Sequence, residues 1–427
     1  MPTSHDHTTA NLTLIKGGRL TPQEFSRLTL PEKLDHLHRL DGKSKLDLLL
    51  TDIDGRQLTQ ALPPMEIYQL TADVGQESVS ELLPLTSPRQ ELFILDQELW
   101  DNDELCPDKA FAWLGTILAA GEEHFLSILP HLDLELIILI LKQAVIVRGG
   151  MGDLISDEER NTDWDHSFDD CYFMRFTNPE HAQLIGVFLD IVFRHDQHLY
   201  LALMEGIKGE LSIEQAELCL QFRAGRLADE GLPTREEALT VYSRVRPDSF
   251  RLVGDKELVA LNDEAGLLAV QQPAADTFIA RLLARLASPE LALELQYLIN
   301  KVLVADGVPL TDNEAVQRTG ERVAGLLSIA LEHLTHGDET QALVIIRSEF
   351  LLRLFHLGFN IVMGLQDLAS TITSDDYPTA KALRGLKEKR PRFYRGLDPD
   401  GVDGYREFAS LADVQRVEQF LALIAER

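Results

Sequence analysis

Apolar residues recur at helical spacing along most of this chain. Leu34, Leu37 and Leu40 stand three positions apart, and similar runs of leucine, valine and isoleucine follow as far as the C-terminus. Residues three and four apart share one face of an α-helix, so each run predicts an amphipathic helix. The pattern therefore predicts an all-α protein.

Prolines divide the first third of the chain into short helices. Leu-Pro pairs stand at 30–31, 62–63, 83–84 and 129–130, and Thr86-Ser87-Pro88 is a further start signal. Proline fits the first turn of a helix but cannot continue a preceding helix. Short amphipathic helices cannot bury their apolar faces alone, so they must stack on their neighbours. Residues 21–147 are predicted to form a right-handed superhelix of helical hairpins, preceded by a disordered polar tail over residues 1–20.

The segment 148–178 interrupts the helical pattern. Glycines near its start break helix, β-branched residues at 145–147 precede it, and aromatic residues at 172–176 lie near its end. These features predict a two-stranded β-ribbon that carries a long acidic loop and lies against the helices.

Helical periodicity resumes after the ribbon. We expect a helical continuation over residues 179–250, in which one helix runs from Pro179 to about Leu203, and a C-terminal helical domain over residues 251–427. Asp338 is a suitable N-cap for the longest predicted helix. The helices expected in the C-terminal domain lie at about 256–270, 274–287, 289–304, 312–335, 339–370 and 411–425.

Composition narrows the classes of partner. The chain has 69 acidic and 40 basic residues, a formal charge of −29. Such a field repels nucleic acid and anionic lipid, and it favours basic protein partners and divalent cations. Cys106, Cys171 and Cys219 are widely separated, which argues against a disulfide framework or a cysteine-based metal site.

Two features place the protein in the cytoplasm. The most apolar run, at 132–147, contains charged residues, and its unbroken apolar stretch is far too short to span a bilayer. The N-terminal residues lack the basic-then-apolar order of a signal peptide. We therefore expect no membrane insertion.

Longer segments of the sequence resemble two known protein families. Residues 48–96 (LLLTDIDGRQLTQALPPMEIYQLTADVGQESVSELLPLTSPRQELFILD) resemble the N-terminal superhelical domain of MgtE-type magnesium transporters, where short Leu-rich helices meet at the same Leu-Pro and Ser-Pro junctions. Over nearly its full length the chain also resembles a domain-of-unknown-function family of soluble bacterial proteins, through residues 82–114, 222–239 (FRAGRLADEGLPTREEAL) and 390–398 (RPRFYRGLD). The first resemblance implies a regulatory or adaptor superhelix that responds to a cation, without a transport function. The second implies a fold and no assigned activity.

A basic cluster stands out near the C-terminus of this acidic chain. Arginine and lysine with interleaved aromatic residues can hold a phosphate, a carboxylate-rich partner or a base. The competing interpretation is that the cluster docks on the protein's own acidic surface. The candidate anion- or partner-binding residues are Arg384, Lys387, Arg390, Arg392 and Arg395, with Lys389 beside them.

Histidine pairs and an acidic alternation are candidates for a divalent cation. A His-x-x-His spacing places two rings on one helix face, and alternating aspartates resemble part of a calcium loop. Two ligands do not make a site, and solvated helix ends and a mobile loop are the competing interpretations, which the sequence favours. The candidate metal ligands are His195, His198, His333, His336, Asp163, Asp165 and Asp169.

Strong catalytic signatures are absent from the sequence. It contains no GxxxxGK[ST], GxSxG or HExxH motif and no Glu-x-x-His pair. The sequence therefore favours a non-enzymatic interaction or regulatory protein that presents a helical surface to a protein partner. The alternative is a metal- or anion-binding protein, including a hydrolase, that uses the acidic loop, the histidine pairs or the basic cluster.

Overall fold

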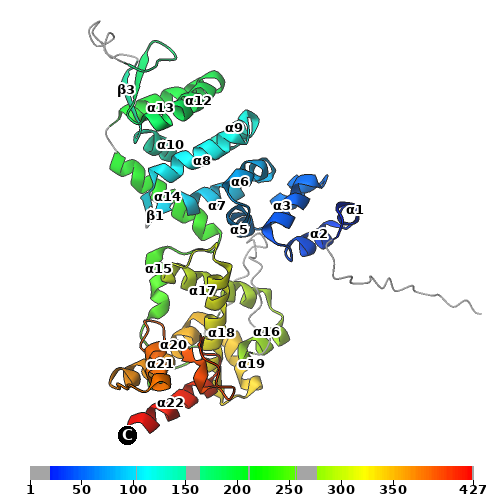
Figure 1. Cartoon of the computed structure of the whole chain (residues 1–427), viewed down its shortest axis with the longest axis vertical. Helices are drawn as coiled ribbons and strands as arrows, with labels where there is room; N and C mark the ends of the chain where they lie inside the picture. The colour runs from blue at the N-terminus through cyan, green and yellow to red at the C-terminus, as the bar shows by residue number, and fades with distance from the viewer. Residues whose placement is uncertain are drawn as a thin grey trace, which may run out of the picture.

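Short helices stack in a row through the N-terminal half of the protein, as a computed structural model shows (Figure 1). The structure describes residues 20–101, 103–150, 164–209, 212–254, 256 and 277–425, so the predicted tail lies outside the described residues apart from Leu20. The row consists of α1 (Pro22–Phe25), α2 (Leu30–Leu37), α3 (Gly42–Thr51), α4 (Gly55–Ala61), α5 (Pro64–Val74), α6 (Gln76–Leu82), η1 (Leu83–Leu85), α7 (Pro88–Glu98), α8 (Pro107–Ala119), α9 (Glu122–Ile128), η2 (Leu129–His131) and α10 (Leu134–Leu141).

Prolines begin these helices as the sequence predicts. Proline occupies the first turn of α2, η1, α7 and η2, and Pro63 is the N-cap of α5. At α7 the Ser87 side chain accepts a hydrogen bond from the backbone N–H of Gln90, and the Gln90 side chain accepts one from the backbone N–H of Ser87. This reciprocal cap satisfies two backbone donors that the helix cannot satisfy itself.

The predicted β-ribbon is present at the far end of the row. Strand β3 (Val145–Gly149) pairs antiparallel with β4 (Tyr172–Phe176), with Val147 opposite Met174. Val145, Val147, Tyr172 and Met174 are buried against the helices. The remaining pairs are β1 (Trp100–Asp101) with β2 (Glu104–Leu105), and β5 (Phe393–Tyr394) with β6 (Tyr405–Arg406).

The helix predicted from Pro179 to Leu203 is two helices, which corrects the sequence interpretation. α12 (Pro179–His195) ends at Asp196, whose φ of −143° and ψ of 88° are not helical, and α13 (Gln197–Lys208) begins there. The Asp196 side chain accepts a hydrogen bond from the backbone N–H of Leu199, so it caps the second helix. α14 (Ser212–Asp229) then contacts α10 and α7 and leads toward the C-terminal half (Figure 1).

The C-terminal half is a helical bundle around α18, which contacts α16, α17, α19, α20 and α22. Most helices predicted for this half are present, because their amphipathic patterning is strong. The helix expected at 256–270 lies outside the described residues apart from Lys256. The bundle consists of α15 (Arg235–Leu239), η3 (Thr240–Tyr242), η4 (Pro247–Ser249), α16 (Phe278–Leu286), α17 (Pro289–Asp306), α18 (Asn313–Thr335), α19 (Glu339–Ser348), α20 (Leu351–Ser370), α21 (Tyr377–Leu386), η5 (Arg395–Leu397) and α22 (Leu411–Ala425).

The longest predicted helix, at 339–370, is also two helices. Asp338 caps α19 as predicted, but Glu349 and Phe350 have extended backbone and separate α19 from α20. The buried Glu349 carboxylate accepts hydrogen bonds from the backbone N–H groups of Val253 and Phe350, at 2.8 and 3.1 Å. One of these bonds is local, and the other ties the break to the distant segment at Val253.

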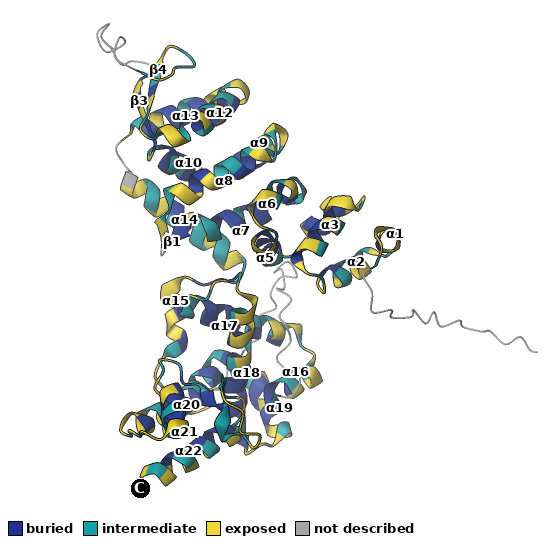
Figure 2. Ribbon diagram, viewed as in Figure 1, coloured by how far each residue is buried: buried dark blue, intermediate teal, exposed yellow. Residues whose placement is uncertain are grey.

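Buried residues face the interfaces between helices, and exposed residues cover the outer surfaces (Figure 2). One apolar core fills the middle of the superhelix, from Val79 to Cys219. A second core combines the first helices with the C-terminal bundle, and it includes Phe25 and Phe355. Within the described residues no single helix is both long enough and apolar enough to cross a membrane. The helical segments 122–131 and 134–141 meet both criteria only when taken together, and they are bent by 114° relative to each other.

Candidate functional site

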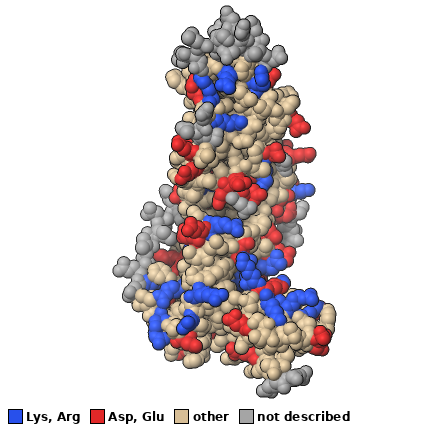
Figure 3. Space-filling view, turned by 90° about the vertical axis from the view of Figure 1, so that its left-hand side faces the viewer, with Lys and Arg blue, Asp and Glu red and all other residues tan. Residues whose placement is uncertain are grey.

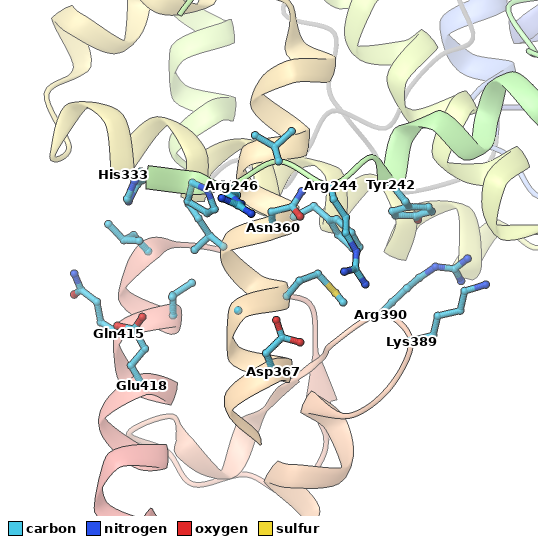
Figure 4. A pocket seen from close by; sticks show the side chains of 18 of the residues that line it. Tyr242, Arg244, Arg246, His333, Asn360, Asp367, Lys389, Arg390, Gln415 and Glu418 are labelled. Atoms are coloured by element: carbon cyan, nitrogen blue, oxygen red, sulfur yellow. The ribbon is translucent and has the colours of Figure 1, made fainter. Parts of the chain in front are cut away.

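A cavity of about 1130 Å³ opens on the C-terminal bundle. Its walls come from the segment between α15 and η4, from α20, from α22 and from the turn after α21. Figure 4 shows Arg244, Lys389 and Arg390 on one side, His333, Gln415 and Glu418 on the other, and Asn360 and Asp367 between them.

Hydrogen bonds from α20 hold the segment after α15 in place. The Asn360 amide donates to the Ser243 carbonyl oxygen at 3.1 Å, and His356 Nε2 lies 3.2 Å from the Thr240 carbonyl oxygen. Both contacts fix the backbone just before Arg244. The Gln366 side chain, also on α20, donates to the Glu388 carbonyl oxygen, so the same helix holds both the segment at 239–247 and the turn at 389–390 that line the cavity.

A buried carboxylate anchors the cationic side of the cavity. The side chain of Asp306, at the end of α17, is fully buried and forms ion pairs with both Arg322 and Arg390. The Tyr242 hydroxyl donates to the same carboxylate at 2.6 Å, and the Arg390 guanidinium lies over the Tyr242 ring at 5.7 Å from its centre. Burial is the main cause that raises the pKa of Tyr242, so the phenol stays a hydrogen-bond donor.

Two positive charges share this single carboxylate. The Nε atoms of Arg322 and Arg390 are buried and have no hydrogen-bond partner among the described residues. Glu407 interacts electrostatically with Arg322, but burial raises the pKa of Glu407 and thereby disfavours its charged form. The cluster therefore retains unused donors next to the cavity.

The cavity lining is basic although the chain is acidic. Lys and Arg gather on the lower part of the molecule, where its surface is notched (Figure 3). The lining contains Arg244, Arg246, Lys389 and Arg390 against two carboxylates, those of Asp367 and Glu418. The side chains of Arg244, Arg246 and Lys389 form no hydrogen bond or ion pair with another part of the chain that the structure describes. The basic lining can hold an anion.

Of the five residues in the predicted basic cluster, the structure brings one to the cavity. Arg390 lines it, together with its neighbour Lys389. The Arg392 guanidinium pairs with Glu388 at 2.7 Å, and Lys387 Nζ donates to the Ile372 carbonyl oxygen at 2.7 Å. Arg395 lies 3.9 Å from Asp400, and Arg384 is exposed on α21. Lys387, Arg392 and Arg395 thus make contacts within their own region of the chain.

The histidine pairs do not share helix faces, which corrects the argument from their spacing. His195 ends α12 and His198 lies in α13, because Asp196 interrupts the helix between them. His195 Nε2 contacts Glu122 at 2.9 Å. His333 is in the last turn of α18, whereas His336 is its C-cap in the left-handed region, at a φ of 51°. Both His333 and His336 line the basic cavity.

The described aspartates of the acidic loop shape the ribbon. Asp165 accepts a hydrogen bond from the backbone N–H of Phe176 at 2.7 Å, and Asp169 accepts from those of Cys171 and Tyr172, each at 2.9 Å. Asp163 lies outside the described residues. Across residues that the structure places, no group of three or more histidine, cysteine or acidic side chains has the arrangement of a metal site.

Sequence reasoning missed Arg244, Arg246 and the buried Asp306. The local signal for the first two is an Arg-Val-Arg triplet before Pro247, in a chain with few such basic clusters. Asp306 carried no signal, because the partners of a buried carboxylate come from helices that are distant in the sequence. Only the fold brings Tyr242, Asp306 and Arg390 together.

The comparisons with known proteins identify the family without an activity. Neither a curated protein nor a solved structure matches the chain significantly. A family of unknown function, DUF6178, matches residues 22–426, which is nearly the whole chain. The chain therefore belongs to this family of unknown function.

Proposed function

We propose that this protein is a non-enzymatic regulatory protein whose C-terminal cavity binds a small anionic ligand. The observation that carries the proposal is the presence of three cationic side chains on the cavity wall, those of Arg244, Arg246 and Lys389, without an anionic partner among the described residues. In a chain of charge −29, unpaired cations would ordinarily find carboxylates nearby. An incoming anion supplies the missing charge.

The cavity suits an organic anion better than a simple ion. Its volume of about 1130 Å³ exceeds the space that a phosphate ion fills, and it is slightly larger than the usual upper limit of about 1,000 Å³ for small-molecule sites. Phe359, Met363 and Val414 contribute apolar surface beside the charged groups. Arginine recognises phosphate and carboxylate groups through paired N–H donors. The ligand class is therefore a phosphorylated or polycarboxylate molecule with an apolar part.

Isothermal titration of the full chain with pyrophosphate, adenosine monophosphate and citrate tests this function. We expect saturable binding of at least one probe, which Arg244→Ala and Lys389→Ala each weaken by about tenfold, since each removes one charge-assisted contact. Arg384→Ala is the matched control, because Arg384 is an exposed arginine outside the cavity lining. An equal loss in Arg384→Ala, or no saturable binding of any probe, would reject the site.

A second proposal concerns the N-terminal superhelix. Its short helices begin at prolines, and its outer surface exposes apolar side chains such as Ile53, which is 93% exposed. A stack of helical hairpins offers an extended surface for a protein partner. The resemblance of residues 48–96 to the MgtE-type superhelix supports an adaptor that responds to a cation, working in the cytoplasm. Cross-linking of the full chain, with and without magnesium, tests whether partner contacts map to this surface and change with the cation.

A further inference from the structure

A second cavity, of about 550 Å³, lies in the superhelix, away from the anion site. It is formed where two helical hairpins meet, between the η1–α7 junction and the α8–α9 junction. The side chains that matter for its chemistry are Glu91 from α7 and Glu122, Glu123 and His124 from α9, with Arg56 also in the lining.

Glu91 is a buried carboxylate without a full set of partners. The residue is 1% exposed, and its Oε2 atom lies 3.1 Å from His124 Nε2. The Oε1 atom of Glu91 has no hydrogen-bond partner among the described residues. His124 Nε2 also has none there, because its contact with Glu91 Oε2 does not have the geometry of a hydrogen bond. A buried carboxylate oxygen that lacks a donor lowers stability, so it calls for a partner that the described residues do not supply.

Neighbouring groups do not supply the missing donor. The Glu122 carboxylate contacts Arg194 and His195, at 3.1 and 2.9 Å, and hydrogen bonds from these two residues lower the pKa of Glu122. Arg56 lies in the lining as an exposed side chain and forms no bond to Glu91. Besides Glu91, the charged side chains that line the cavity are one arginine, Arg56, and two glutamates, Glu122 and Glu123. Their net charge is therefore negative.

We propose that this cavity receives the guanidinium group of an arginine side chain from a protein partner. Glu91 Oε1 accepts one N–H, and His124 Nε2 accepts another when its imidazole is neutral and protonated on Nδ1. A guanidinium presents several N–H donors in a fixed planar fork, which matches two acceptors held side by side. A metal ion would need further ligands, and the described residues offer no group of three at this place. The partner is thus a protein with an accessible arginine, and its binding does not depend on the anion site.

Ligand-observed saturation-transfer NMR on the full chain tests the proposal with N-acetyl-arginine amide. The matched probe is N-acetyl-citrulline amide, which has nearly the same shape but carries a neutral urea in place of the guanidinium. We expect the arginine compound to bind about tenfold or more tightly than the citrulline compound, because the charge-assisted bonds to Glu91 are lost in the latter.

Two variants separate the cavity from general charge effects. Glu91→Gln keeps the side-chain shape and is expected to reduce arginine binding about tenfold or more, whereas Glu81→Gln, an exposed position on α6, leaves it unchanged. A melting curve establishes that each variant is folded. Equal binding of the two compounds, or full binding by a folded Glu91→Gln variant, overturns the proposal. If Glu91→Gln does not fold, the comparison of the two compounds on the unmodified chain decides alone.

Discussion

Gly325 lies where α18 and the chain near Phe408 pack backbone against backbone. A Cβ atom at this position would stand 1.8 Å from the Phe408 carbonyl oxygen, whereas at Gly320, on the same helix, it would meet no atom within 4 Å. We expect Gly325→Ala to lower the free energy of unfolding by about 1–3 kcal/mol through overpacking. Gly320→Ala should raise it by roughly 0.5–1 kcal/mol, because alanine favours helix. Urea denaturation compares the two, and equal changes would contradict the close approach.

His356 makes stability depend on pH. Burial lowers its pKa, Lys301 and Arg353 lower it further, and the contact with the Thr240 carbonyl opposes them. The unfolded chain binds the proton at a pKa of about 6.5, while the folded protein resists it. The unfolded state then binds more protons, so stability is lost as the pH falls below about 6.5 toward the lower folded pKa. Melting temperatures from about pH 7.5 to 5.5 should fall less steeply in His356→Gln, and parallel profiles would contradict this.

The candidate site shows how far residue-level reasoning from sequence reaches. Arg390 was identifiable because it stands in a basic cluster in an acidic chain. Its neighbours in that cluster were indistinguishable from it, although Arg392 and Lys387 make local contacts. Composition locates charge along the chain, but only tertiary structure separates the arginine that faces a cavity from those paired nearby.

At the scale of elements, the break between α19 and α20 depends on one buried carboxylate. Glu349 accepts the backbone N–H groups of Val253 and Phe350, and Glu294 accepts that of Leu351, the first residue of α20. Lys256 Nζ donates to the Glu349 carbonyl oxygen at 3.2 Å and to Glu294, which ties the preceding segment to the break.

Removal of the Glu349 carboxylate should therefore destabilise the bundle. We expect Glu349→Ala to lower the free energy of unfolding by about 1–3 kcal/mol, since two partly buried backbone donors lose their acceptor. Glu349→Gln keeps one acceptor oxygen and should lose less. Denaturation of both variants, with the exposed Glu236→Ala as the control, measures the difference. A similar loss in Glu236→Ala, or none in Glu349→Ala, would show that the carboxylate does not stabilise the break.

The helices themselves were largely predictable, and their breaks were not. Proline at a helix start is a local signal, so α2 and α7 were predicted from sequence alone. The breaks at Asp196 and Glu349 contain neither glycine nor proline, and the polar run at 194–198 around the first is also compatible with the exposed face of a continuous helix. Aspartate and glutamate stop these helices by bonding to backbone groups, and in the case of Glu349 one partner comes from a distant segment.

At the scale of the whole molecule, α14 ties the superhelix together before the chain enters the C-terminal bundle. Arg226 on α14 bonds both oxygens of Asp96, on α7, at 2.7 Å, and it also bonds Asp133, just before α10, at 2.8 Å. Desolvation is the main cause that raises the pKa of Asp96, against the effect of Arg226. One guanidinium thus compensates two carboxylates on separate hairpins.

Replacement of that guanidinium should loosen the superhelix before it affects the bundle. Arg226→Met keeps much of the side-chain volume but leaves the buried Asp96 without its cation, which we expect to cost about 3–5 kcal/mol. Because the middle of the superhelix has its own apolar core, calorimetry should show an earlier transition for this part, while the bundle melts near its original temperature. Arg39→Met is the matched control: Arg39 pairs with Asp35 where both side chains are exposed, and its loss should cost no more than about 1 kcal/mol. A single transition shifted as a whole would instead mean that the superhelix and the bundle unfold as one cooperative unit, joined through the core that the first helices share with the C-terminal half.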